Sequence, residues 1–157
     1  MARRKADHLL GEWGEIPDRL RNVITGRDLR ELSSLPGSDG LSLTETIHHI
    51  VEANMVAATI IIAAAGAKEP TFDWSWMWPN KAWCKRLNYD HVAVEPSIEA
   101  LRGLIAHLAS ILSSDSSILA RKVRLLDSPD AKTYSKSIRQ IIQTEIDHAS
   151  QHLGDIS

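Results

Sequence analysis

The segment TYSKSIRQIIQTEIDHASQHLGDI, from Thr133 to Ile156, decides the fold that the sequence predicts. When its residues are placed at 100° steps around a helix, both His148 and His152 project into the apolar face. Glu145 projects there too, one turn before His148, and the opposite face is polar. The apolar face comprises Tyr134, Ile138, Ile141, Ile142, Ala149 and Ile156. The segment is therefore predicted to be an amphipathic helix that turns two imidazoles and a carboxylate toward the core.

Polar groups that face a core need partners, because an unpaired buried polar group costs about 1–3 kcal/mol. A bound metal ion is a simple common partner for two histidines at positions i and i+4. Backbone carbonyls or water would satisfy the same two side chains, and HxxxH pairs also arise by chance. The metal hypothesis therefore depends on a third ligand from elsewhere in the chain.

Candidates for that third ligand lie in a second predicted helix, which begins after Ser42 and ends at Gly66. Ser42 and Glu45 have the spacing of a capping box. The residues that follow form two apolar stripes, as expected of a helix that is covered on two sides in a bundle. His49 heads one of these stripes, whereas His48 lies at the margin. Both remain candidates, and the pattern favours His49.

Apolar residues at helical spacing predict two more helices, over residues 4–25 and 97–113. Pro17 indicates a break in the first of them, and Pro96 begins the other. No convincing strand is recognised. The sequence is therefore expected to form a single all-α domain, residues 1–157, with the architecture of an antiparallel helical bundle.

A tryptophan-rich segment, residues 70–80, lies between the second and third long helices and contains Trp74, Trp76 and Trp78. It is interpreted as a loop whose rings either cap the core or line a pocket. Cys84, just beyond, has no neighbour in the sequence that would activate its thiol.

Composition excludes several classes of protein. The length of 157 residues suits one core, and 43% hydrophobic with 24% charged residues is ordinary for a globular chain. The net charge of −2 offers no general attraction for nucleic acid or an anionic membrane. A single cysteine excludes an internal disulfide, and the charged N-terminal segment does not resemble a signal peptide, so a cytoplasmic location is expected. The longest apolar run, residues 55–67, is too short to span a bilayer.

Helix direction decides whether the histidines can meet. His49 lies near the start of its helix, and His148 and His152 lie near the end of theirs, so antiparallel packing would place them together. Parallel packing would separate them by about 20 Å. Three neutral imidazoles would leave coordination positions open for water, a thiol or a carbonyl. Glu145 would then orient a histidine or act as a base, unless it forms an outward salt bridge.

Two motifs resemble the DinB/YfiT-like superfamily of metal-dependent helical-bundle proteins. LSLTETIHHIVEAN (Leu41 to Asn54) resembles the family's capped second helix, Ser-x-x-Glu followed four residues later by a histidine, here His49. HASQHLGDI (His148 to Ile156) resembles its closing His-x-x-x-His-x-Gly-x-Ile element. Two positions depart from the family pattern: Leu153 replaces a common basic residue, and Asn54 replaces a common carboxylate or histidine.

The resemblance implies a four-helix bundle with a divalent ion, usually assigned as nickel, zinc or iron, held by His49, His148 and His152. Better-understood branches of the family are S-transferases or isomerases that use low-molecular-weight thiols, and relatives often form homodimers. The leading hypothesis is therefore a metal-dependent transferase or hydrolase acting on a small molecule, with Glu145 as its catalytic carboxylate. The alternative is a non-catalytic metal-binding or stress-associated helical-bundle module.

Overall fold

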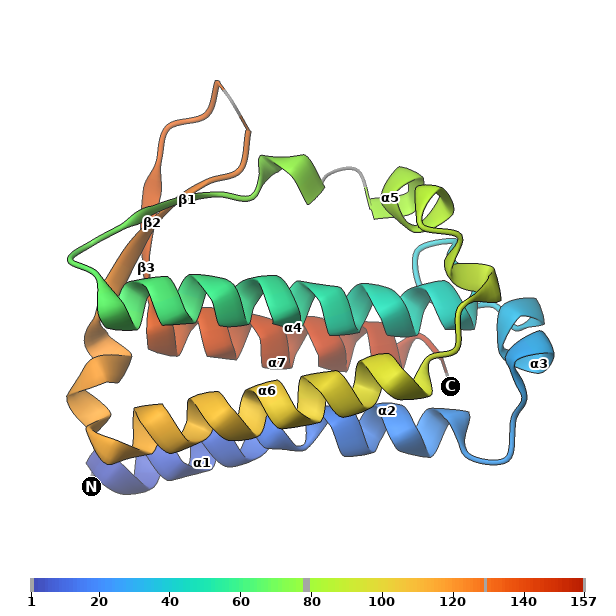
Figure 1. Ribbon diagram of the computed structural model, residues 1–157, viewed down its shortest axis with the longest axis horizontal. Helices are drawn as coiled ribbons and strands as arrows, with labels where there is room; N and C mark the ends of the chain where they lie inside the picture. The colour runs from blue at the N-terminus through green and yellow to red at the C-terminus, as the bar shows by residue number, and fades with distance from the viewer. Residues whose placement is uncertain (1, 78–79, 129, 157) are drawn as a thin grey trace.

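The computed structural model describes residues 2–77, 80–128 and 130–156. Long helices form its body, and Figure 1 shows them side by side along the longest axis. They are α1 (Ala2–Gly14), which α2 (Ile16–Ile24) continues, α4 (Leu43–Gly66), α6 (Glu95–Ser114) and α7 (Ile138–Gly154). The connections contain α3 (Leu29–Ser34), α5 (Asn80–Arg86), the 3-10 turns η1 (Ser75–Met77), η2 (Tyr89–His91) and η3 (Ser116–Ala120), and the strands β1 (Thr71–Asp73), β2 (Lys122–Leu126) and β3 (Tyr134–Ser137).

The helix boundaries follow local signals in the sequence. Ser42 accepts a hydrogen bond from the backbone N–H of Glu45, whose side chain accepts one in return, so the predicted capping box begins α4. The first predicted helix is broken at Glu15, just before Pro17, and this break separates α1 from α2. Pro96 lies in the first turn of α6, as its position in the sequence predicts.

The chain returns along the bundle between its second and third long helices. In Figure 1, α4 and α6 run in one direction, and α1, α2 and α7 run in the other. Residues 67–94 make the return, so α4 and α6 lie side by side and parallel. The predicted antiparallel packing of α4 against α7 is confirmed, and the long helical segments form a four-helix bundle (Figure 1). The expectation of an antiparallel bundle is wrong for α4 and α6, because the connection over residues 67–94 runs back along the bundle and makes these two helices parallel (Figure 1).

A small sheet at one end of the bundle shows that the prediction of a strictly all-α domain is wrong. β1 pairs in parallel with β2, and β2 pairs in antiparallel fashion with β3. Val123 and Leu125 of β2 point into the core, whereas the alternating residues between and before them are exposed. The sheet joins β1 to a segment about fifty residues later, so no local pattern reveals it.

Two expected boundaries change because of this sheet. The last helix begins at Ile138 rather than Thr133, since Ser137 and Gln140 form a capping box and residues 134–137 are the strand β3. The tryptophan-rich segment is not simply a loop, since it contains β1, η1 and the start of α5. Trp78 lies outside the described residues.

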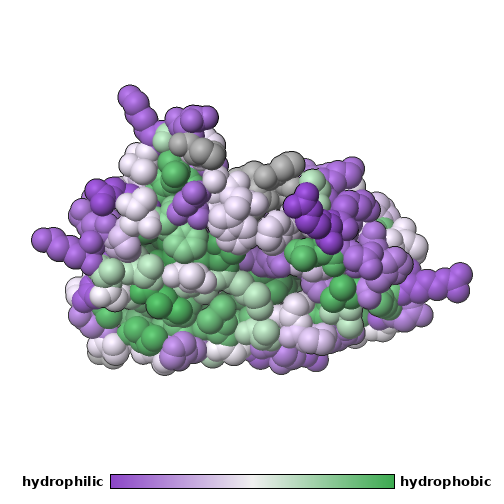
Figure 2. Space-filling view, turned by 45° about the horizontal axis from the view of Figure 1, so that its top comes forward, coloured by the Kyte–Doolittle hydropathy of each residue, from purple (hydrophilic) through white to green (hydrophobic). Residues whose placement is uncertain are grey.

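Helix α4 is the central element of the bundle. It packs against α6, α7 and α3, and 15 of its residues are buried. By length and composition alone it would qualify as a membrane-spanning helix, a property that the buried core helix of a globular protein shares. Apolar side chains also gather on the outer face that Figure 2 shows. Ile62 of α4 and Ile111 of α6 are among the exposed hydrophobic side chains of the molecule.

Candidate metal centre

Three imidazoles meet between the start of α4 and the end of α7. The Nε2 atom of His148 lies 3.1 Å from Nε2 of His49 and 2.8 Å from Nε2 of His152. The three ring planes are nearly perpendicular to one another, at 83–88°. One nitrogen of each ring therefore points toward a common centre, and these atoms lie within 4.8 Å of one another. The structure thus brings together the three residues that the sequence singles out.

Two of these imidazoles are almost completely buried, and the third opens the site to solvent. His49 and His152 are 6% and 5% exposed, whereas 26% of the His148 side chain is exposed. Burial, followed by the neighbouring His148 and His152, lowers the pKa of His49 to about 4. Burial and His148 also lower the pKa of His152, against the opposing effect of Asp39 and Asp155. His49 and His152 are therefore neutral at pH 7, which is the form that binds metal ions.

The arrangement fits a cation better than it fits three free imidazoles. A neutral imidazole carries one N–H and one lone pair, so three converging Nε2 atoms cannot all be paired with one another. Glu145 Oε2 and His148 Nδ1 are also buried without a hydrogen-bond partner in the described part of the chain, 3.7 Å apart. A cation at the three Nε2 atoms would keep the His148 proton on Nδ1, where it faces this carboxylate.

Glu145 is buried at the site rather than turned outward. Its side chain is 6% exposed and lies beside Nδ1 of His148, on the ring edge away from the converging Nε2 atoms. The outward salt bridge considered for this residue is therefore excluded by its position. The geometry supports a role in orienting His148.

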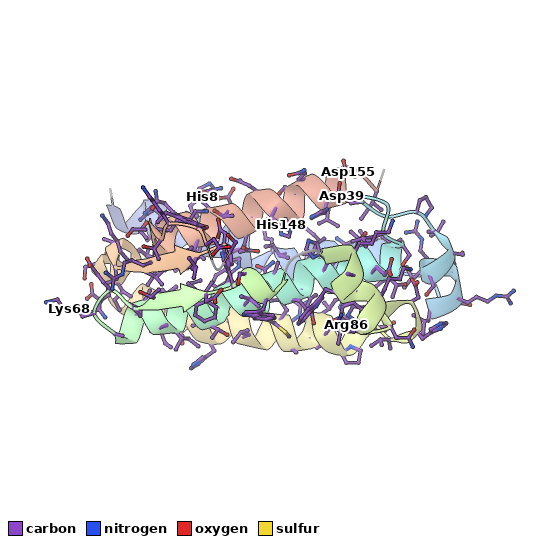
Figure 3. All side chains as sticks on the ribbon, turned by 90° about the horizontal axis from the view of Figure 1, so that it is seen from above. His8, Asp39, Lys68, Arg86, His148 and Asp155 are labelled. Atoms are coloured by element: carbon purple, nitrogen blue, oxygen red, sulfur yellow. The ribbon has the colours of Figure 1, made fainter. Side chains whose placement is uncertain are left out.

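Ser38 and Asp155 complete the surroundings of His152. Nδ1 of His152 lies 2.7 Å from the Ser38 hydroxyl, which lies 2.8 Å from Oδ2 of Asp155. Asp39 contributes a second carboxylate 3.8 Å from the same nitrogen. Figure 3 shows Asp39 and Asp155 near the end of α7 that carries His148. Sequence reasoning missed Ser38, because 114 residues separate it from His152 and no motif links the two.

Comparisons with known proteins agree with this architecture. A solved structure of YfiT from Bacillus subtilis, described as a probable metal-dependent hydrolase with an unusual four-helix bundle topology, matches with a TM-score of 0.81. The match covers 98% of this chain and 84% of that chain, at 16% identity. This chain has the YfiT fold. The fold that the resemblance to the DinB/YfiT-like superfamily implies is thereby confirmed.

A curated relative gives a second, partial match. A protein from Geobacillus thermodenitrificans, provisionally named a metal-dependent hydrolase, is 25% identical over 100 residues. The match covers 64% of this chain and 54% of the relative, so this chain spans about half of that protein's length. No family model matches the sequence.

Within this YfiT-like fold, His48 faces away from the centre. Its Nε2 atom donates to the carbonyl of Val92 at 3.1 Å, and its ring stacks on Tyr89 with centroids 4.3 Å apart. Burial lowers the pKa of His48, although the Val92 carbonyl and Glu52 oppose the change. Of the two adjacent histidines, His49 is therefore the member of the cluster, and His48 anchors η2 to α4.

The aromatic residues near α5 are mostly fixed by carboxylates. The indole of Trp83 and the hydroxyl of Tyr89 both donate to Glu52 of α4. The indole of Trp74 donates to Asp127, whereas Trp76 is 50% exposed and its ring centroid lies 5.2 Å from that of Trp83. The contacts of Trp83 and Tyr89 hold α5 and η2 against α4, whereas that of Trp74 joins the residue after β1 to the residue after β2.

Two other polar positions are structural. Asn54, a departure from the family pattern, accepts a hydrogen bond from the buried indole of Trp13 and donates to the carbonyl of Ile50, both at 2.9 Å. It therefore ties α4 to α1 and lies outside the histidine cluster. Burial, Glu45 and Glu52 raise the pKa of the Cys84 thiol to about 11, which keeps it protonated, in agreement with the quiet role predicted for it.

A cavity within the described residues lies away from the histidine cluster. A cavity of about 580 Å³ lies at the opposite end of α4, between residues 66–69 and 120–122, and contains none of the histidines. Converging ring nitrogens are a more specific sign of a ligand site than a large volume, so the histidine cluster is the candidate centre. His148 is the member of the cluster that is most exposed to solvent.

Proposed function

We propose that His49, His148 and His152 bind a divalent metal ion and that the protein is a metal-dependent hydrolase of a small molecule. The observation that carries the proposal is the convergence of three imidazole nitrogens within 4.8 Å of one another, one of them on the partly exposed His148. Imidazole donors suit zinc, nickel and iron, and three of them leave positions open for a substrate. When bound, such an ion acts as a Lewis acid that polarises a carbonyl or phosphoryl group and lowers the pKa of water.

The protein's own residues would hold and orient the site. His49 and His152, neutral and buried, supply lone pairs from two different helices, so their positions depend on the packing of α4 against α7. Glu145 accepts the Nδ1 proton of His148 when Nε2 is a ligand, which supports a positioning role in preference to that of a base. The exposed edge of His148 is the side from which a substrate approaches.

Hydrolysis is favoured over thiol transfer by two observations. YfiT is described as a probable metal-dependent hydrolase, and the Geobacillus relative is provisionally named one. Leu153, directly after the last histidine, packs against the core and offers no charge to an anionic thiol. Thiol-dependent transfer is the second candidate, carried by the resemblance to thiol-using branches of the superfamily.

Metal analysis tests the first part of the proposal. Purified protein reconstituted with zinc, nickel or iron(II) is expected to retain one ion per chain after gel filtration. His49→Gln, His148→Gln and His152→Gln should each lose it, because every variant removes one of three ligands. His48→Gln is the matched control, since it changes the adjacent buried histidine outside the cluster. Retention of the ion by all three ligand variants would refute the site.

Turnover assays test the second part. The metal-loaded protein is expected to hydrolyse small esters, amides or phosphoesters, to lose this activity with a chelator, and to regain it when the ion is restored. Turnover only in the presence of a low-molecular-weight thiol would assign the transferase reaction instead. A metal-dependent rise in melting temperature without any turnover would support the non-catalytic module.

A further inference from the structure

The loop before α4 is built to hold the Ser38 side chain against α7. Its backbone forms a tight turn, with hydrogen bonds from Gly37 N to Leu41 O and from Leu41 N to Ser38 O. The backbone N–H of Ser38 donates to Thr46 Oγ1 at 3.0 Å, which ties the loop to the first turns of α4. Ser38 itself is 2% exposed. The loop backbone therefore restricts the Ser38 hydroxyl to partners on α7.

Gly37 permits this close approach. A Cβ atom at position 37 would lie 2.1 Å from Thr46 Oγ1 and 2.5 Å from the carbonyl oxygen of Ser42. Neither distance is compatible with a side chain, so glycine is needed for the loop to lie directly on α4. The position of the Ser38 hydroxyl is therefore determined by the backbone around it.

The direction of the hydrogen bonds follows from the count of protons. The Asp155 carboxylate only accepts, so the Ser38 hydroxyl, 2.8 Å away, donates its one proton to it. Ser38 Oγ must then accept from His152 Nδ1, which lies 2.7 Å away. The neutral imidazole of His152 consequently carries its proton on Nδ1. Its Nε2 lone pair faces His148 and the centre of the cluster.

We propose that Ser38 and Asp155 are positioning residues that hold His152 in the tautomer with a free Nε2, so that this ring is prepared as a ligand before an ion arrives. We call the hydrogen-bonded row of Asp155, Ser38 and His152 the relay. Its role in metal binding rests on the proposed function, whereas the tautomer of His152 does not. The hydrogen-bonded row runs from Asp155 through the Ser38 hydroxyl to His152, and Asp39 adds negative charge beside the same nitrogen. Partners of this kind fix the orientation and raise the basicity of a ligating histidine.

Nitrogen-15 NMR of histidine-labelled, metal-free protein at neutral pH tests the relay directly. Two-bond proton–nitrogen correlations distinguish a protonated Nδ1 from a protonated Nε2. His152 of the wild type is expected to be protonated on Nδ1. Ser38→Ala and Asp155→Ala should increase the fraction protonated on Nε2, because each removes a link of the row. Asp147→Ala is the control, since it removes an exposed carboxylate of α7 whose partner is Gln143.

Zinc affinity, measured against a competing chelator, tests the use of the relay. Loss of such a partner typically weakens metal binding by about 10–100-fold. We expect this loss in Ser38→Ala and Asp155→Ala, and no loss in Asp147→Ala. Asp155 is exposed and Ser38→Ala keeps the backbone bonds of the loop, so both variants should fold.

The outcomes separate the relay from the proposed function. A wild-type His152 protonated on Nε2, or a tautomer unchanged in both variants, would overturn the relay whether or not the protein binds metal. A changed tautomer with unchanged zinc affinity would overturn its role in metal binding. A wild type that binds no ion but has the expected tautomer would refute the proposed function and leave the relay standing.

Discussion

Acid should destabilise the metal-free protein through His49. Burial and the neighbouring imidazoles lower the pKa of this residue from 6.5 to about 4. Between these two values the unfolded chain binds a proton at position 49 and the folded chain does not. The free energy of unfolding therefore falls as the pH falls from about 6.5 to about 4, and it is unaffected by this group at higher pH.

The magnitude follows from the difference between the two pKa values. Each pKa unit corresponds to about 1.36 kcal/mol, so a change from 6.5 to about 4 removes about 3 kcal/mol once the window has been crossed. The lowered pKa values of His48 and His152 act in the same direction. A typical domain is stable by about 5–15 kcal/mol, so this contribution is large enough to measure.

Urea unfolding of chelator-treated protein, from neutral pH down to about pH 4, is the assay. His49→Gln should flatten the dependence of the unfolding free energy on pH by up to about 1.4 kcal/mol per pH unit. His107→Gln makes the same change on the exposed side of α6 and should leave the dependence as it is in the wild type. Identical pH dependence in wild type and His49→Gln would refute the reasoning.

Two substitutions away from the histidines probe the packing that positions them. Gly37→Ala should destabilise the protein by about 1–3 kcal/mol in urea unfolding, because its Cβ would overlap Thr46. Gly103→Ala, where no atom lies within 4 Å of the added Cβ, should instead stabilise α6 by up to about 1 kcal/mol. Asn54→Ala should cost about 1–3 kcal/mol in the same assay, because the buried Trp13 indole loses its acceptor. Equal stability of Asn54→Ala and the wild type would show that the indole finds another partner.

The parts of the fold that the sequence predicted are those that depend on neighbours in the chain. The start of α4 is visible because Ser42 and Glu45 bond to each other across three residues. The start of α7 was misplaced although Ser137 and Gln140 make the same kind of cap. Tyr134 continues the apolar stripe of the helix, and its hydroxyl instead reaches Asp127 from β3. Periodicity alone does not distinguish a helical turn from a short strand that precedes it.

The candidate site likewise contains residues that the sequence predicts and residues that it does not. The apolar stripes of α4 favour His49 over His48, because they show which face of the helix meets a neighbour. Antiparallel packing against α7 then brings His49 to His148 and His152. Ser38 could not be found by this route, because a hydroxyl in a loop has no period and its partner is 114 residues away. Helix periodicity therefore predicts the candidate ligands. It does not predict the groups that set their protonation, because those groups come close only through tertiary contacts.

The buried polar side chains of α4 outside the histidine cluster have hydrogen-bond partners, whereas two atoms at the cluster have none in the part of the chain that the structure describes. Asn54 forms hydrogen bonds with Trp13 and with the carbonyl of Ile50, and His48 forms one with the carbonyl of Val92. These bonds replace the hydrogen bonds to water that the side chains lose on burial. At the end of α7, Glu145 Oε2 and His148 Nδ1 lack partners within the described residues. These two atoms face each other across 3.7 Å. Glu145 faces a donor when the proton of His148 lies on Nδ1, and this tautomer leaves the Nε2 lone pair of His148 free to bind a cation.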